Sequence, residues 1–229
     1  MTGSSPGVIP LIIPVIIPLI IPVIIKIVLK VGLTGGLACG KTFVGEVLVE
    51  LGCHLLEADR LGHQVLLPGG EAYAPVVREF GAGILLGTGE INRRALAAQV
   101  FGRPDRLELL NSFVHPPVLR REREWLEGVA ARDPHGIAVV EAAILIETGG
   151  YKRFDQLILV ACEMEQQIQR SMKRDGASRE EAMARLQRQM PLAEKRAFAG
   201  FVIDTSGTKE ETVRQTRAVY DSLRRVEQP

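Results

Sequence analysis

Short apolar runs alternate with amphipathic stretches along most of the chain. The runs typical of strands are continuous rather than alternating, and they lie at 27–33, 53–59, the start of 136–145, 154–162 and 201–205. Apolar residues recur at helical spacing over 41–51, 163–175, 179–189, 191–200 and 208–226, and helical patterns dominate 60–132. Continuous apolar strands alternating with helices predict an α/β fold whose parallel sheet is covered by helices on both faces.

The N-terminal segment does not follow this rhythm. Residues 8–25 hold 14 aliphatic residues, four prolines and no charge, and the octapeptide IPLIIPVI occurs twice from Ile9. The run is long enough to suggest a membrane span, but each interior proline costs a helix about 3 kcal/mol. A signal peptide would need a basic residue before its apolar run, and none precedes this one. We expect residues 1–26 to be an extension outside the fold, with the true start near residues 27–28. A disordered or membrane-associating tail is the alternative.

Composition narrows the class of protein. The 28 Lys and Arg residues nearly balance the 27 Asp and Glu residues, so charge gives no case for nucleic acid as a partner. Hydrophobic residues make up 46% of the chain, which excludes general disorder. Three cysteines without a CxxC pair fit a reducing, cytoplasmic setting. We expect residues 27–229 to form one domain with no membrane partner and with a monomer favoured.

A glycine-rich motif lies between the first expected strand and the first expected helix. It fits GxxxxGK[ST], the phosphate-binding loop or P-loop, and consists of Gly35, Gly36, Leu37, Ala38, Cys39, Gly40, Lys41 and Thr42. Glycines let backbone N–H groups face phosphates, and the helix N-terminus adds partial positive charge. We expect Lys41 to reach the β- and γ-phosphates of ATP and Thr42 to coordinate Mg²⁺, with Phe43 also in the nucleotide site.

The remaining motifs favour one class of P-loop protein. A GTPase would need [NT]KxD to read guanine, and the nearest string, residues 172–175, reads MKRD. The chain is also short for a motor or helicase. A small nucleoside-phosphate or metabolite kinase is therefore favoured. Such an enzyme needs an acid near the acceptor hydroxyl, a helical acceptor-binding insert and a lid that bears arginines.

Acidic residues occur at the ends of two expected strands. Asp59 ends the strand after the P-loop helix, and strand carboxyl ends face the ligand crevice in open α/β sheets. It could take the proton of an acceptor hydroxyl or hold Mg²⁺; a helix N-cap for a segment starting at Arg60 is the structural alternative. Glu57 would share its strand face if the strand reaches that far. Glu141 follows the apolar run 137–140, where it could bind Mg²⁺ through water or be a solvent-facing strand end.

Four arginines are candidates for a lid over the nucleotide. Arg170 and Arg174 are one helical turn apart and share a face, and Arg185 and Arg188 follow on the next expected helix. Guanidinium groups can close over ATP phosphates and neutralise charge in the transition state. The alternative is a solvated, ion-paired helix face, because Asp175 lies nearby in the sequence.

One histidine stands at an expected helix end. His115 precedes two prolines, Pro116 and Pro117, which are expected to stop the helix there. A packing or helix-end role is favoured over that of a general acid.

From about residue 28 to 226 the chain resembles bacterial dephospho-CoA kinases. The resemblance rests on strings that occur in order: VGLTGGLACGKT (31–42), LLEADRLGHQVLLPGGEAY (55–73), ILLGTGEINRRALAAQVF (84–101), LNSFVHPPV (110–118), VVEAAILIETGGYKRFD (139–155), QRSMKRDGASREEAMARLQRQMPLAEKRAFA (169–199) and FVIDTSG (201–207). It implies a kinase that uses ATP and Mg²⁺ to phosphorylate the ribose 3′-hydroxyl of dephospho-CoA, giving CoA and ADP in the last step of coenzyme A biosynthesis. It also implies a P-loop core with a five-stranded parallel sheet, an acceptor-binding helical insert over about 60–132 and a helical lid over about 166–192.

The same resemblance assigns residue roles by position. Asp59 matches the second acid of a DxD motif and is the expected base. Lys41 and Thr42 match the phosphate and Mg²⁺ residues, and Arg170 and Arg174 match lid residues. The family usually has Gly and Ser at the positions of Ala38 and Cys39, and Glu57 replaces the first Asp of DxD. Two alternatives stay open: a P-loop kinase for another small hydroxyl or nucleotide acceptor, and a nucleotide-binding protein that has lost catalysis.

Overall fold

A computed structural model of the chain describes residues 28–226. Five strands form one sheet in the order β2-β3-β1-β4-β5, and every neighbouring pair is parallel. The strands are β1 (Leu29–Gly35), β2 (His54–Glu57), β3 (Ile137–Glu141), β4 (Gln156–Ala161) and β5 (Phe201–Asp204). The expected five-stranded parallel sheet is confirmed.

Helices connect the strands. Those before β3 are α1 (Lys41–Glu50), α2 (Ala58–Gln64), α3 (Tyr73–Phe80), α4 (Arg93–Val100) and α5 (Pro104–Arg132), and those after β4 are α6 (Met164–Asp175), α7 (Arg179–Leu186), α8 (Leu192–Lys195) and α9 (Lys209–Val226). Short 3₁₀ turns are η1 (Ala82–Ile84), η2 (Gly150–Arg153) and η3 (Arg196–Phe198). The helix expected over 191–200 is therefore only one α-helical turn, α8, followed by η3.

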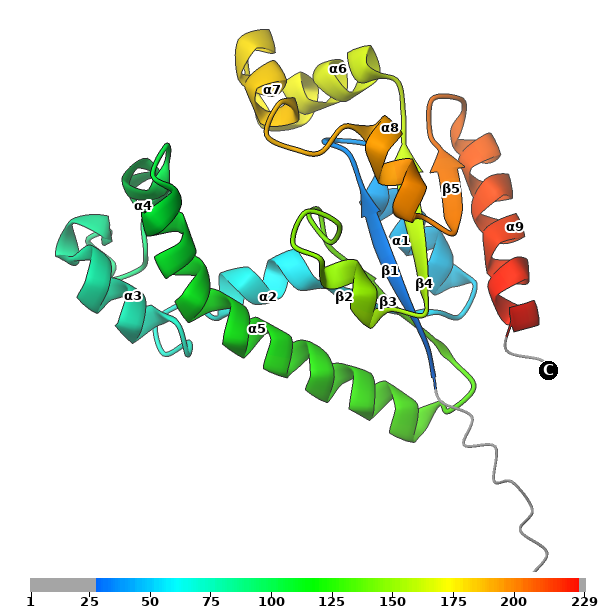
Figure 1. Cartoon of the computed structure of the whole chain (residues 1–229), viewed down its shortest axis with the longest axis horizontal. Helices are drawn as coiled ribbons and strands as arrows, with labels where there is room; N and C mark the ends of the chain where they lie inside the picture. Colours follow the sequence, from blue (N-terminus) through cyan, green and yellow to red (C-terminus); the bar gives the residue numbers. More distant parts are fainter. Residues whose placement is uncertain (1–27, 227–229) are drawn as a thin grey trace, which may run out of the picture.

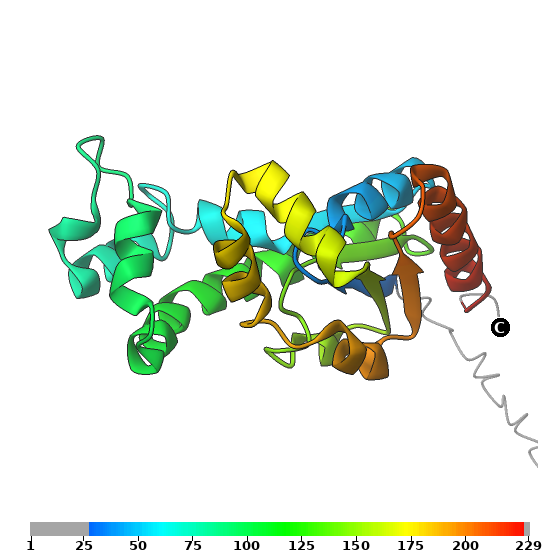
Figure 2. The same cartoon turned by 90° about the horizontal axis from the view of Figure 1, so that it is seen from above.

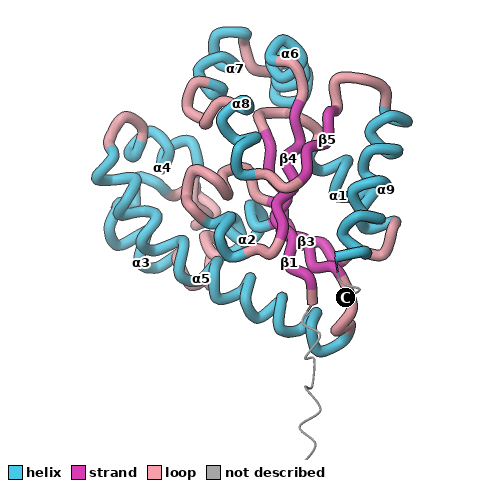
Figure 3. Tube along the Cα trace, turned by 45° about the vertical axis from the view of Figure 1, so that its right-hand side comes forward, coloured by secondary structure: helices cyan, strands magenta, loops and turns pink. Residues whose placement is uncertain are grey.

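Helices cover both faces of the sheet, as the continuous apolar strands predict. Alternate residues of β1, such as Val31 and Leu33, pack with α1 and α9 in the largest apolar cluster. On the other face, Val28 packs against Val129 near the end of α5. Figures 1 and 3 show α1 and α9 on one side of the strands and α5 crossing on the other.

The helices between β2 and β3 have an apolar core of their own. Residues of α3, η1 and α4, together with Val65 just after α2, form a cluster separate from that of the sheet, in which Val76 and Ile84 are fully buried. Arg121 of α5 is ion-paired to Glu71 at 2.7 Å, which ties α5 to the segment before α3. Figure 2 shows α3 and α4 at one end of an elongated molecule and α9 at the other.

The long helix α5 corrects one expectation. Pro116 and Pro117 lie inside α5, which continues to Arg132, so the prediction that they stop the helix is wrong. A proline removes one backbone hydrogen bond but need not end a helix that packs on both sides of it. Leu110 and Val118, before and after the prolines, both pack against the helical cluster.

The apolar repeat at residues 8–25 and the prediction that residues 1–26 are an extension both lie outside the described residues. Within residues 28–226, no helix has the length and apolar character needed to cross a membrane.

Candidate active site

The carboxyl ends of three parallel strands bring the candidate residues to one edge of the sheet. The register pairs Leu33 of β1 with Glu141 of β3, and Glu141 with Glu57 of β2. The P-loop follows β1, so it leaves the sheet beside these two acids. The order of the strands therefore joins segments that lie far apart in the sequence.

The backbone of the P-loop adopts a close packing and a conformation that require glycine. A Cβ at Gly35 would lie 2.4 Å from the Val160 carbonyl oxygen, and Gly40 has φ of 80°. Gly40 is also the N-cap of α1, where no side-chain cap occurs among the described residues, so the first helical N–H groups can meet phosphate. The Thr205 hydroxyl donates to the Cys39 carbonyl at 2.8 Å, which ties the loop to the end of β5.

Lys41 interacts electrostatically with both predicted acids, Asp59 and Glu141. Its ammonium donates to the Gly36 carbonyl within the loop at 3.4 Å. Burial lowers the pKa of Lys41, and the negative charges of Glu141 and Asp59 oppose that shift. The electrostatic coupling shows that the fold gathers Lys41, Asp59 and Glu141 around one space.

Thr42 and Glu141 fit a magnesium site. The Thr42 hydroxyl donates to Oε1 of Glu141 at 3.4 Å. The other oxygen, Oε2, is buried and has no hydrogen-bond partner within residues 28–226, and burial raises the pKa of Glu141. A buried carboxylate oxygen of this kind suits Mg²⁺ or a water bound to it. No three His, Cys, Asp or Glu side chains form a metal cluster in the described part, but Mg²⁺ in kinases needs only one or two side chains besides phosphates.

Asp59 is placed differently from its expected strand end. β2 ends at Glu57, and Asp59 lies in the first turn of α2, whose N-cap is Glu57. The predicted position of Asp59 at the end of the strand and its N-cap alternative are therefore both wrong. One side of Asp59 is open to solvent. Protein atoms on its other side raise the pKa of the carboxyl by desolvation, while Lys41, His63 and the backbone N–H of Ala143 lower it.

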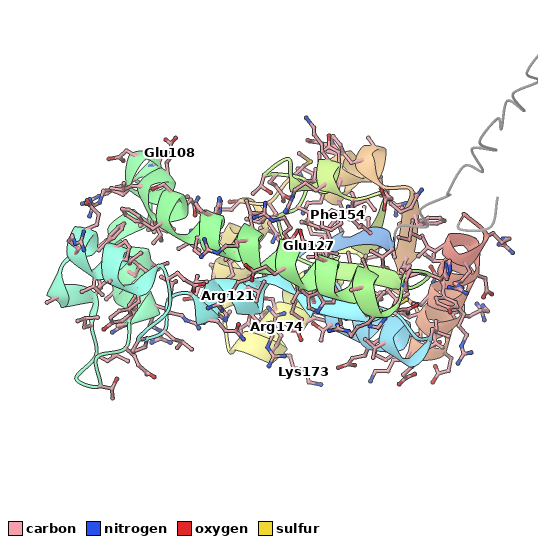
Figure 4. All side chains as sticks on the ribbon, turned by 90° about the horizontal axis from the view of Figure 1, so that it is seen from below. Glu108, Arg121, Glu127, Phe154, Lys173 and Arg174 are labelled. Atoms are coloured by element: carbon pink, nitrogen blue, oxygen red, sulfur yellow. The ribbon has the colours of Figure 1, made fainter. Side chains whose placement is uncertain are left out.

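The two lid arginines have different surroundings. Arg170 bonds the hydroxyl and the carbonyl of Thr205 at 3.1 and 2.7 Å, and Thr205 in turn contacts the P-loop. Arg174 bonds both oxygens of Asp175 at 2.8 and 3.0 Å, and Arg185 shares that carboxylate. Figure 4 shows Arg174 beside Lys173 on α6 at the outer edge of the molecule. The structure thus brings Arg170, but not Arg174, to the P-loop.

A cavity of about 660 Å³ opens beside Asp59. Its walls come from α2, the middle of α5 and the segment after β3. They mix apolar side chains such as Leu119 and Ile144 with a few polar ones, which include Asp59, His63, His115 and Arg153. Arg153 is ion-paired at 2.7 Å to Glu122, whose side chain is 4% exposed. A mostly apolar cavity with sparse polar groups is typical of a small-molecule site.

Several lining residues escaped the sequence analysis. Glu122 lies in the charged run RREREW and Arg153 in YKRFD, and both runs resemble solvent-facing surface. Only the crossing of α5 over the segment after β3 brings Glu122 and Arg153 together. His115 was singled out, but its place on the cavity wall follows from the continuation of α5 through the prolines.

The central P-loop, the parallel sheet and the helical subdomain define a P-loop kinase. A profile of the family described as dephospho-CoA kinase matches residues 29–211. The dephospho-CoA kinase of Aquifex aeolicus is 39% identical over 187 residues, which cover 82% of this chain and 93% of that protein. That of Carboxydothermus hydrogenoformans is 40% identical over 178 residues, 78% of this chain and 86% of that protein. The chain belongs to the dephospho-CoA kinase family.

Two solved structures share the fold of this chain. TT1252 from Thermus thermophilus matches with a TM-score of 0.76 at 33% identity, covering 86% of this chain and 98% of that one. The dephospho-CoA kinase from Campylobacter jejuni has a TM-score of 0.57 at 23% identity, covering 85% and 96%, and shows that the fold is shared.

Proposed function

We propose that this chain transfers the γ-phosphoryl group of ATP to the ribose 3′-hydroxyl of dephospho-CoA, giving CoA and ADP. The observation that carries the proposal is the position of Asp59, which lines the cavity and whose carboxylate lies near enough to the P-loop lysine for the two charges to interact. Membership of the dephospho-CoA kinase family supports the choice of acceptor. An acceptor seated in the cavity would present its hydroxyl between Asp59 and the phosphates.

The P-loop backbone and Lys41 bind the ATP phosphates in this proposal. Lys41, largely buried and flanked by acids, would neutralise charge that develops on the transferred group. Phe43 and Arg170 would lie beside the nucleotide. Arg170 is held near the P-loop by its bonds to Thr205. Thr42 and Glu141 would hold Mg²⁺, which supplies charge neutralisation on the phosphates when bound.

Asp59 orients the 3′-hydroxyl and takes its proton as the hydroxyl oxygen bonds to the γ-phosphorus. The bond between that phosphorus and the bridging oxygen of ATP breaks, and ADP leaves with the electron pair. Desolvation raises the pKa of Asp59 and so makes it a better base than an exposed aspartate. The phosphate of the new product then lies beside Lys41 until release.

The helical parts supply binding and closure. We infer that residues from about 60 to 132 form the acceptor-binding insert and residues from about 166 to 192 form a lid, within one kinase domain that begins near residue 27. Arg174 would leave Asp175 and turn toward the phosphates when the lid closes, excluding water that would otherwise hydrolyse ATP. The three cysteines are all thiols, which supports the proposed cytoplasmic setting.

An acceptor panel tests this function. ADP release is measured with dephospho-CoA, with nucleoside monophosphates and without acceptor, for the wild type and for Lys41→Ala, with Lys30→Met at the opposite end of β1 as a matched lysine control. We expect turnover that needs dephospho-CoA and is lost in Lys41→Ala only. Turnover with another acceptor alone, or nucleotide binding with no turnover, would instead support one of the two alternatives.

A further inference from the structure

A fully buried lysine lies behind the candidate site. The side chain of Lys195, the last residue of α8, is 0% exposed. Its ammonium is ion-paired at 2.8 Å to Oε1 of Glu147 and lies 3.4 Å from each of two backbone carbonyls, those of Gly35 and Ala143. An ammonium has three N–H donors, and these three acceptors match them. Lys195 is thus satisfied without any bound ligand.

The acceptors belong to segments that carry the proposed chemistry. Gly35 is the last residue of β1 and the first of the P-loop. Ala143 follows β3. Its carbonyl accepts from the Lys195 ammonium and from the Thr34 hydroxyl, and its N–H lies close enough to the Asp59 carboxylate to lower the pKa of Asp59. One ammonium therefore contacts both the start of the phosphate site and the carbonyl of the residue whose N–H faces the proposed base.

The third acceptor, Glu147, connects Lys195 to the segment that follows α7. The carboxylate oxygen of Glu147 that pairs with Lys195 also accepts the backbone N–H of Met190 at 3.3 Å, in the segment between α7 and α8. Glu147 itself follows β3 next to Thr148, which lines the cavity. The segment that returns from α7 is thus fixed to the cavity wall at the point where Lys195 enters.

We infer that Lys195 is a positioning residue, whose buried ammonium holds the start of the P-loop and the backbone at Ala143 at a fixed separation and so sets the distance between the ATP phosphates and Asp59. This inference rests on the proposed function, because it assigns Lys195 to the same transfer step. Phosphoryl transfer depends on placing donor and acceptor within a few tenths of an ångström, so a group that spans both sides acts on kcat.

Stability alone does not explain this lysine. A buried charge pair replaced by apolar residues of similar size is often neutral or stabilising. Lys195 also carries a local electrostatic cost: burial is the main cause of the lowered pKa of Lys41, and the positive charge of Lys195 lowers it further. Lys195 disfavours the charged form of Lys41, and a methionine of similar length could fill its place. Its presence is therefore better explained by the geometry that its three contacts impose.

The test compares three variants for kcat, acceptor KM, nucleotide Kd, thermal unfolding and backbone hydrogen exchange. Lys195→Met keeps the length of the side chain and removes its charge and donors. Glu147→Gln keeps an oxygen that can accept from Lys195 and from the Met190 N–H. Thr216→Val is the control, since it removes a fully buried hydroxyl of α9, bonded to the Thr212 carbonyl at 2.8 Å, far from the site.

We expect kcat to fall about tenfold or more in Lys195→Met and about threefold or less in Glu147→Gln, with acceptor KM and nucleotide Kd changing less than kcat. Thr216→Val should lower the unfolding temperature and leave kcat unchanged. Exchange should speed up over residues 35–40 and 142–149 in Lys195→Met but not in Thr216→Val.

Two results would overturn the inference. One is a Lys195→Met enzyme with wild-type kcat and wild-type exchange in both segments. The other is a fall in kcat that tracks the unfolding temperature equally in Lys195→Met and Thr216→Val. A wild type that does not turn over dephospho-CoA would contradict the proposed function instead, and the exchange data alone would then decide whether Lys195 fixes the two segments.

Discussion

At the scale of single residues, the P-loop contains a strained position. Ala38 has φ of 51°, in the left-handed region where a side chain costs about 1–2 kcal/mol relative to glycine. We expect Ala38→Gly to raise the free energy of unfolding by up to about 1 kcal/mol, since the entropy that glycine gains in the unfolded chain offsets part of the relief. Thermal unfolding measures the change. Ala98→Gly, at an exposed position of α4, should lower stability instead, and a loss of stability in Ala38→Gly would contradict the strain.

Asp59 gives a second residue-scale prediction, on stability against pH. Desolvation raises its pKa in the folded state above the unfolded value, so the charged carboxylate opposes folding once the pH exceeds the unfolded pKa. We expect Asp59→Asn to unfold at a higher temperature than the wild type at pH 7, a difference that shrinks as the pH falls toward about 4. Asp105→Asn, in the first turn of α5, is the matched control. If Asp59→Asn were less stable than the wild type at pH 7, desolvation would not be what governs the pKa of Asp59.

At the scale of elements, α5 accommodates two prolines. Pro116 is exposed within the helix, and its ring removes the bond that a backbone N–H would make to the Ser112 carbonyl. We expect Pro116→Ala to stabilise the protein by about 1–3 kcal/mol, as seen in chemical denaturation. Pro117→Ala, which empties part of a buried site, should gain less or lose stability. If Pro116→Ala were destabilising, the proline would be required for the path of α5.

The same helix shows how far sequence can predict this fold and site. Continuous apolar strands and the P-loop motif predict the sheet, the central loop and the edge at which Glu141 lies, because those features depend on local pattern. The path through Pro116, the cavity pair Glu122 and Arg153, and the burial of Lys195 depend on packing between distant segments. In the sequence each of these residues resembles a helix stop or a solvated charge, so local pattern carries no sign of its role.

At the scale of the whole molecule, the proposed role of Arg174 predicts that the α6–α7 region moves during catalysis. Arg174 bonds Asp175 and not the P-loop in this structure. For Arg174 to act in catalysis, closure of the proposed lid has to replace its bonds to Asp175 by bonds to the ATP phosphates. We expect Arg174→Ala to lower kcat about tenfold to a thousandfold with a small change in nucleotide Kd, as steady-state kinetics and nucleotide titration would show. Lys173→Ala, the neighbouring cation, should change kcat little. An equal fall in kcat in Arg174→Ala and Lys173→Ala would show that the positive charge of this region matters, and not a specific contact of Arg174.

We propose that one edge of the sheet places the γ-phosphate of ATP against the ribose 3′-hydroxyl of dephospho-CoA. The most direct test is to identify the phosphorylated carbon of the product by phosphorus–proton coupling in NMR, after reaction with the wild type and with Asp59→Asn. We expect a 3′-phosphate from the wild type and about a hundredfold or greater loss of its formation in Asp59→Asn. Phosphate on any other position, or undiminished 3′-phosphate from Asp59→Asn, would contradict the account.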